Sequence, residues 1–183
     1  ENMSEKAVLF LKAALDKSEE FSTEELAKNS KKVLKIANKT LKTKPLRIAI
    51  ASDHAAFHMK ESLKSHLKNY ITHDFGTDSS EPMDYPETGF AAAEAVASGE
   101  YNYGIILCGS GIGMSIVANK VKGIRAALCH CTDYARLARM HNDANVLVMP
   151  GRFISDYLAQ EIITIFLNTH FEGGRHQKRI EKI

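Results

Sequence analysis

The chain has 183 residues, enough for one domain with a substantial core and an appendage, and 44% of the residues are hydrophobic. Its net charge is +2, and the basic excess lies in residues 1–44, where 10 lysines face 7 acidic residues. The near-neutral remainder argues against nucleic-acid binding, and the apolar runs are far shorter than a bilayer span. We therefore expect no nucleic-acid partner, no membrane helix and no secretory signal.

The chain contains three cysteines, Cys108, Cys129 and Cys131. They do not form the even, spaced set that staples small secreted domains, so we expect no disulfide. Free thiols suit a reducing compartment. The sequence therefore predicts a cytoplasmic protein.

Residues 1–44 contain neither glycine nor proline and show two amphipathic helical patterns. The second pattern begins at a capping box formed by Ser22 and Glu25, and a polar segment ending at Pro45 stops it. We predict a helical N-terminal extension over 1–44 and a main domain over 45–183. The extension is interpreted as a packed appendage without chemistry. The alternative is an arm that binds a partner or covers an oligomer surface.

From residue 46 the pattern alternates between strand and helix. The strands are expected at 46–51, 70–75, 105–107, 124–128 and 146–149, and the helices at 57–67, 87–97, 114–120, 132–140 and 154–168. Short links separate them, as is typical of βα units. This order predicts an α/β domain with a five-stranded parallel sheet and helices on both faces, a three-layer sandwich of the Rossmann or flavodoxin type.

Ligands of such sheets bind beyond the carboxyl ends of the strands. That rule places several polar segments at one edge: Asp53-His54, the 77–86 loop, Cys108–Gly113, Cys129–Thr132 and Pro150–Arg152. We expect further polar residues to converge on the same edge, namely Asp84, Tyr85, His141, Asn142, Arg175 and Arg179.

The stretch from Tyr103 to Met114 combines a buried strand, a glycine-rich loop and the start of a helix. Glycines at positions 109, 111 and 113 let the backbone turn tightly and expose successive N–H groups, which stabilise an oxyanion or a phosphate. The same field favours the thiolate form of Cys108 at the end of the strand. The alternative is a plain turn beside a small buried cysteine.

Six motifs occur in order: Ala51–Phe57 (ASDHAAF), Asp84-Tyr85-Pro86, Cys108–Gly113 (CGSGIG), Ala118-Asn119-Lys120, His141–Asn145 (HNDAN) and Glu172–His176 (EGGRH). Together they resemble the type B ribose 5-phosphate isomerases. The resemblance covers about residues 46–183 and none of the extension. It implies an enzyme that interconverts ribose 5-phosphate and ribulose 5-phosphate through an enediolate, in the pentose phosphate pathway.

The resemblance also implies three catalytic roles. Cys108 stands at the position of the base that moves the carbon proton, and Ser110, where the family usually has Thr, relays a proton between the two sugar oxygens. His141 matches the residue that opens the furanose ring, a task that suits an imidazole because it titrates near neutral pH. The backbone of Gly109, Gly111, Ile112 and Gly113 would bind the developing oxyanion.

The remaining matched residues are expected to bind the sugar phosphate. Asp53 and Tyr85 match residues on the ring-opening side, and Asn142 matches a ligand of a sugar hydroxyl. The phosphate-binding set is His54, Arg152, Arg175 and Arg179, and guanidinium suits phosphate because it is planar and always charged. The family resemblance further implies a homodimer or a dimer of dimers with shared active sites, and neither a metal nor another cofactor.

Several alternatives stay open. Galactose 6-phosphate or allose 6-phosphate could be the substrate, and a non-catalytic flavodoxin-like module could use the same topology to hold FMN or a regulatory phosphate. Cys129-His130-Cys131 could suggest zinc, but no fourth ligand stands at finger-like spacing, so packing is the preferred interpretation.

Overall fold

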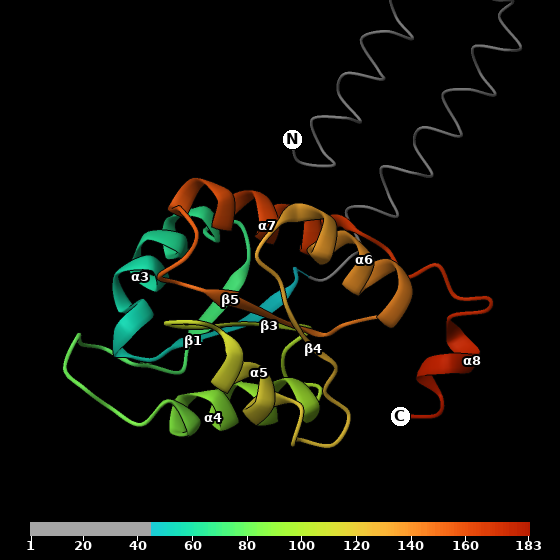
Figure 1. The fold of residues 1–183 in the computed structure, drawn as a ribbon, viewed down its shortest axis with the longest axis horizontal. Helices are drawn as coiled ribbons and strands as arrows, with labels where there is room; N and C mark the ends of the chain where they lie inside the picture. The colour runs from blue at the N-terminus through green and yellow to red at the C-terminus, as the bar shows by residue number, and fades with distance from the viewer. Residues whose placement is uncertain (1–44) are drawn as a thin grey trace, which may run out of the picture. The chain divides into compact units, whose positions relative to one another are not determined.

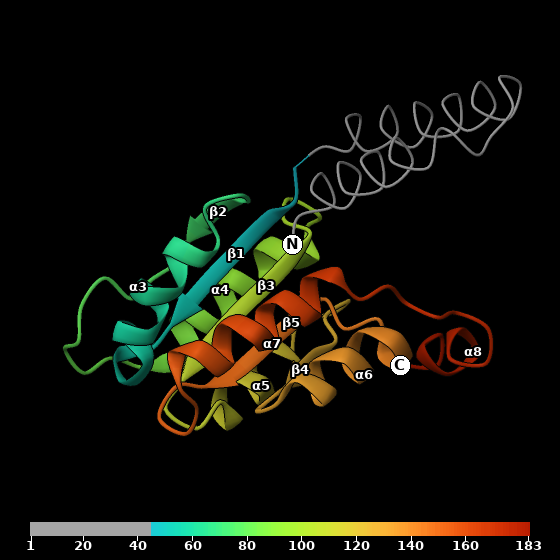
Figure 2. The same cartoon turned by 90° about the horizontal axis from the view of Figure 1, so that it is seen from above.

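A computed structural model describes residues 45–183. Its centre is a five-stranded sheet in the order β2-β1-β3-β5-β4, and every pairing in it is parallel (Figures 1 and 2). The strands are β1 (Arg47–Ser52), β2 (Ile71–Asp74), β3 (Tyr103–Cys108), β4 (Ala126–Leu128) and β5 (Val146–Pro150).

Helices cover both faces of the sheet, as Figure 1 shows. One face carries α3 (Phe57–His66), α6 (Thr132–Asn142) and α7 (Asp156–Asn168), and the other carries α4 (Tyr85–Ala97) and α5 (Ile112–Ala118). A short 3-10 turn, η2 (His54–Ala56), follows β1, and α8 (Gln177–Ile180) lies near the C-terminus. The three-layer sandwich predicted from the sequence is confirmed.

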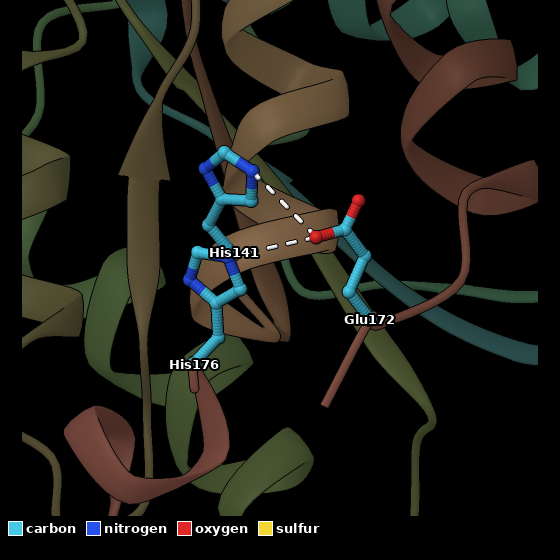
Figure 3. Close-up of side chains that lie close together, drawn as sticks. All are labelled: His141, Glu172 and His176. Atoms are coloured by element: carbon cyan, nitrogen blue, oxygen red, sulfur yellow. Dashed lines mark ion pairs between the residues drawn. The ribbon is translucent and has the colours of Figure 1, made fainter. Parts of the chain in front are cut away.

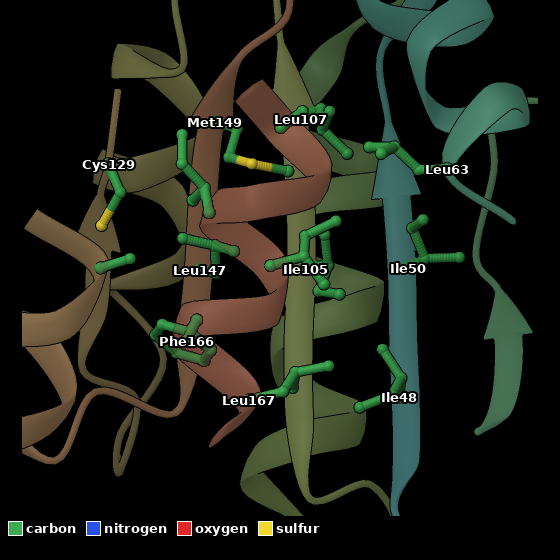
Figure 4. Close-up of a cluster of buried hydrophobic side chains, with 14 of the residues drawn as sticks. Ile48, Ile50, Leu63, Ile105, Leu107, Cys129, Leu147, Met149, Phe166 and Leu167 are labelled. Atoms are coloured by element: carbon green, nitrogen blue, oxygen red, sulfur yellow. The ribbon is translucent and has the colours of Figure 1, made fainter. Parts of the chain in front are cut away.

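The core follows the two-residue period of the strands. Ile105 and Leu107 of β3 point into the larger cluster under α3, α6 and α7 (Figure 4). Ile106 and Cys108 belong to the second cluster, on the face covered by α4 and α5. Phe166 of α7 is fully buried in the larger cluster. Replacing such an aromatic side chain by alanine costs about 3–5 kcal/mol, so this face contributes much of the stability.

The strand order has a simple physical basis. All five residues of β5 are buried, whereas the three residues of β4 are only partly buried. The longer apolar strand therefore takes the interior position beside β3, and the short strand forms an edge. Compared with the flavodoxin order 2-1-3-4-5, the last two strands are exchanged.

Element boundaries differ modestly from the predicted ones. Helix α4 begins at Tyr85 instead of Glu87, because Pro86 occupies the first turn, where its missing N–H costs nothing. Strand β3 starts two residues earlier than predicted, and β4 starts two residues later. The predicted helical extension lies outside the described residues. Within residues 45–183, no helix combines the length and apolar character needed to cross a bilayer.

Candidate active site

The loop between β3 and α5 is built around Cys108. The Cys108 side chain is only 5% exposed, and its Sγ accepts a hydrogen bond from the backbone N–H of Gly111 over 3.1 Å. Gly111 has φ of +75°, and an added Cβ there would lie 2.4 Å from the Leu128 Cδ1 atom. Only glycine satisfies both conditions, so the loop sequence fixes the position of the thiol.

Two further side chains lie in or against this loop. The Ser110 hydroxyl is exposed, and its Oγ accepts a bond from the Ile112 N–H over 3.3 Å. The ring of Tyr85, from the start of α4, lies against Gly113, where an added Cβ would come within 2.7 Å of the ring carbon Cζ. Tyr85 therefore forms one wall beside the loop, and Gly113 leaves room for it.

Asp53 and His54 follow the neighbouring strand β1. The Asp53 carboxylate accepts from the Ala56 N–H over 3.1 Å and caps η2, while its own N–H donates to the Leu107 carbonyl of β3. The Nδ1 atom of His54 accepts from the Met83 N–H over 3.2 Å. This bond ties the 77–86 loop to the end of β1.

Arg152 completes this group from the end of β5. The Arg152 N–H donates to the Gly109 carbonyl over 3.0 Å, and the Gly151 N–H donates to the Cys108 carbonyl over 2.9 Å. The Arg152 side chain passes Gly109, where an added Cβ would lie 3.4 Å from its Cδ. The carboxyl edge of the sheet thus gathers Asp53, His54, Tyr85, Arg152 and the loop Cys108–Gly113. It does so where β1 and β3 meet, the topological switch point at which such sheets bind ligands.

The expectation that His141, Asn142, Arg175 and Arg179 converge on this edge is wrong for a single chain. Helix α6 starts after the carboxyl end of β4 and runs back, so His141 and Asn142 lie at its far end. There the Arg139 guanidinium donates to the hydroxyl of Tyr103, the first residue of β3, over 3.1 Å. Five residue steps along β3 lead from Tyr103 to Cys108, so about 17 Å of strand separates this amino edge from Cys108.

The amino edge holds a second polar cluster, formed by His141, Glu172, His176 and Arg175 (the amino-edge cluster). Figure 3 shows three of its side chains facing one another. The rings of His141 and His176 are stacked, with centroids 4.2 Å apart and planes within 5°. Glu172 Oε2 lies 3.5 Å from His176 Nε2 and 3.9 Å from His141 Nε2. The Arg175 Nε–H points at His176 Nε2 over 3.3 Å.

The sequence interpretation gave no role to His176 or Glu172, although both stand in the Glu172–His176 motif. Burial lowers the pKa of His176, and the neighbouring His141, Arg175 and Arg179 lower it further, against the opposing effect of Glu172. The donor from Arg175 also requires a lone pair on His176 Nε2. In this arrangement His176 Nε2 therefore serves as a hydrogen-bond acceptor.

His141, Glu172 and His176 offer ligand atoms within 4.8 Å of one another, which suits a metal ion by distance. The ring orientations suit a metal ion less well, because stacked rings hold their nitrogen lone pairs in two separate parallel planes, which do not meet at one point. Arg175 also occupies the lone pair of His176. As arranged, the cluster is built for stacking and hydrogen bonding.

The Cys129-His130-Cys131 segment offers little to zinc. Cys129 is only 1% exposed and packs within the larger core cluster. Among residues 45–183, neither cysteine gathers with two further ligand side chains. The structure thus supports the packing interpretation.

Comparisons with known proteins agree on one family. The sequence profile of the Ribose/Galactose Isomerase family matches residues 48–183. Ribose-5-phosphate isomerase B of Escherichia coli is 45% identical over 139 residues, which cover 75% of this chain and 93% of the relative. D-erythrulose-4-phosphate isomerase of Pectobacterium atrosepticum is 44% identical over 141 residues, 75% of this chain and 93% of the relative. A crystal structure of a Thermotoga maritima ribose 5-phosphate isomerase superposes with a TM-score of 0.74 at 53% identity, covering 75% of this chain and 96% of that one.

Proposed function

Because the chain belongs to the ribose/galactose isomerase family, we propose that it is an aldose–ketose isomerase that interconverts ribose 5-phosphate and ribulose 5-phosphate. The observation that carries the proposal is the Cys108 thiol, which is held by the Gly111 N–H within a glycine-rich loop. The three free cysteines suit a cytoplasmic enzyme.

In the proposed reaction Cys108 acts as the base at the carbon next to the carbonyl. Its thiolate takes the C2 proton of the open-chain aldose, and the electron pair moves through C1 to the carbonyl oxygen to give the enediolate. N–H groups of the Gly109–Gly113 backbone stabilise the oxyanion, and the Ser110 hydroxyl relays a proton from O2 to O1. Return of the proton from Cys108 to C1 gives the ketose. This sequence needs no added co-reactant.

The carboxyl edge of one chain lacks His141, the proposed ring-opening residue, and two of the four proposed phosphate ligands, Arg175 and Arg179. We assign ring opening to His141, contact with a sugar hydroxyl to Asn142, and phosphate binding to Arg175 and Arg179 together with His54 and Arg152. Asp53 and Tyr85 line the ring-opening side. Since His141 lies at the amino edge, about 17 Å of strand from Cys108 within one chain, the complete site requires residues of a second copy.

We therefore infer a homodimer in which the carboxyl edge of one chain receives the amino edge of its partner. Helix α5, beside the Cys108 loop, supports this arrangement because Ile112 and Ile116 are each 57% exposed. Two exposed isoleucines on one short helix favour coverage by another apolar surface. A dimer of dimers is compatible with the same contact.

The decisive experiment is an assay of the purified chain with ribose 5-phosphate, allose 6-phosphate, galactose 6-phosphate and erythrulose 4-phosphate. The last is included because a relative of nearly equal identity is named for it. The highest kcat/KM is expected for ribose 5-phosphate. A preference for a hexose or tetrose phosphate would change the assigned substrate but keep the assigned reaction, aldose–ketose isomerisation. Binding without conversion of any of them would favour a non-catalytic phosphate-binding module, and a flavin absorption band would favour FMN.

A further inference from the structure

His176 contacts two residues that the proposed function uses for different tasks. Its imidazole is only 5% exposed, stacks on His141 and accepts the hydrogen bond from Arg175. All three belong to the same chain. One buried ring thus touches both the proposed ring-opening group and a proposed phosphate ligand.

The Arg175 side chain depends on this contact. Arg175 follows Gly173 and Gly174, which have φ of +67° and +55°, so it projects from a turn that only small residues adopt easily. Within residues 45–183, its only hydrogen bond from the guanidinium is the one to His176. Without that acceptor, the guanidinium would sample many rotamers before it met a phosphate.

Charged side chains of both signs surround His176. Arg175 and Arg179 of the C-terminal segment are cationic, Glu172 is anionic, and His141 approaches from α6. Because His176 accepts from Arg175 at Nε2, it has no proton to share with Glu172 there. The Glu172 carboxylate, 3.9 Å from His141 Nε2, is therefore left to face His141 when that imidazole carries its proton.

Resting on the proposed function, we propose that His176 is a positioning residue that holds His141 and Arg175 as one unit, at the separation that a five-carbon sugar phosphate requires. Ring oxygen and phosphate belong to one substrate, so the groups that engage them must keep a fixed distance. A misplacement of about 1 Å can cost on the order of a hundredfold in rate. The stack sets the position of His141, and the Nε2 acceptor sets that of Arg175.

The two contacts can be removed separately. His176→Phe keeps a flat ring against His141 but removes the acceptor, whereas His176→Gln keeps an acceptor near the position of Nε2 but removes the aromatic stack. For His176→Phe we expect KM for ribose 5-phosphate, and Kd for inorganic phosphate, to rise roughly tenfold with kcat nearly unchanged. For His176→Gln we expect the opposite split, with kcat reduced roughly tenfold and phosphate affinity retained.

A double-mutant cycle tests the Arg175 contact independently. Arg175→Lys keeps the charge but cannot reproduce the Nε donor. If His176 acts through Arg175, adding His176→Phe to Arg175→Lys should weaken phosphate binding no further. Additive losses would show that His176 does not act through Arg175 and would overturn that half of the proposal.

Three further outcomes contradict the proposal. Equal loss of kcat and phosphate affinity in both variants, with a lowered melting temperature, would make His176 a packing residue only. Unchanged kcat, KM and phosphate affinity in both His176 variants would show that His176 has no role in the active site. Stoichiometric binding of Zn²⁺ to the wild type, abolished by His176→Phe, would identify a metal site instead. A wild-type protein that converts no sugar phosphate would refute the proposed function itself, whereas an active wild type without the split refutes only this inference.

Discussion

The backbone N–H of Gly111 donates to the Sγ atom of Cys108 over 3.1 Å, across the turn that joins β3 to α5. This bond holds a buried sulfur beside a loop whose other N–H groups can receive an oxyanion. In the proposed mechanism the thiol therefore moves the carbon proton, while the surrounding backbone N–H groups stabilise the oxyanion.

Replacing Cys108 by alanine is expected to reduce kcat by about a thousandfold or more while Kd for ribose 5-phosphate changes little. The thiol acts on the carbon proton and makes no contact with the phosphate in the proposed mechanism. Single-turnover kinetics and calorimetric binding measure the two quantities. Cys131→Ala is the matched control and should retain activity, because its side chain makes no cap hydrogen bond to α6. Exchange of the C2 proton in deuterated water at the wild-type rate would reveal a different base.

His141→Asn is expected to remove ring opening and leave proton transfer intact. Such a variant can use only the free aldehyde that forms spontaneously in solution. Its initial rate with ribose 5-phosphate should therefore stop rising at high enzyme concentration, where spontaneous ring opening limits the reaction. For the wild type, the initial rate should stay proportional to enzyme concentration. The same is expected of the control variant His170→Asn, which changes an exposed histidine. Proportionality in His141→Asn would place His141 in another step.

Mixed chains test whether the two edges meet between copies. Cys108→Ala and Arg175→Ala proteins are each expected to be weakly active or inactive at low substrate. In a heterodimer with shared sites, one site carries both lesions and the other carries none, so mixing should restore about a quarter of wild-type activity. Native mass spectrometry checks that heterodimers form. If they form and no activity returns, each chain completes its own site.

Asp74 gives a prediction for acid stability. Burial opposes ionisation of this carboxyl, but hydrogen bonds from Lys60, Lys64 and the Gly76 N–H outweigh it and lower the pKa of Asp74. The carboxylate therefore stabilises the fold above the ordinary aspartate pKa, and that contribution is lost as pH falls below about 4. Lys60 is fully buried and bonds Asp74 over 2.6 Å.

We expect Asp74→Asn to lower the free energy of unfolding by about 2–4 kcal/mol at pH 7, because it removes the shorter of the two ion pairs of the buried Lys60 ammonium and leaves only the pair with Glu61. The difference from wild type should shrink as pH falls below about 4. Urea unfolding at several pH values measures it. Glu100→Gln, which breaks the exposed Arg47–Glu100 pair, should cost less than about 1 kcal/mol. An equal effect of the two substitutions would contradict a special role for the buried lysine.

The sequence predicted the strand, loop and helix around Cys108 because glycine spacing and a buried β-branched run act locally. It also predicted which segments follow the strands at the carboxyl edge. The position of His141 was missed, since the motif resemblance was assigned to one edge without following α6 back across the sheet. A helix of 11 residues is about 16 Å long, which already carries His141 away from that edge.

The stacking of His176 on His141 could not be predicted from the sequence. It depends on how the segment after α7 returns to the end of α6, where the Glu172 N–H donates to the Met140 carbonyl over 3.0 Å. No periodic pattern specifies such a loop. The only available signal was that both histidines stand in motifs shared with the same family.

The interior place of β5 bears on how the chain is made. During synthesis β3 and β4 emerge before β5, yet both must pair with it. Until Val146–Pro150 leaves the ribosome, β3 keeps an open apolar edge and β4 has no partner strand, a state prone to association with other chains. A nascent chain that stops before Val146 should therefore be a chaperone client. The final 38 residues, from Val146 on, thus determine whether the strands made before them can pair.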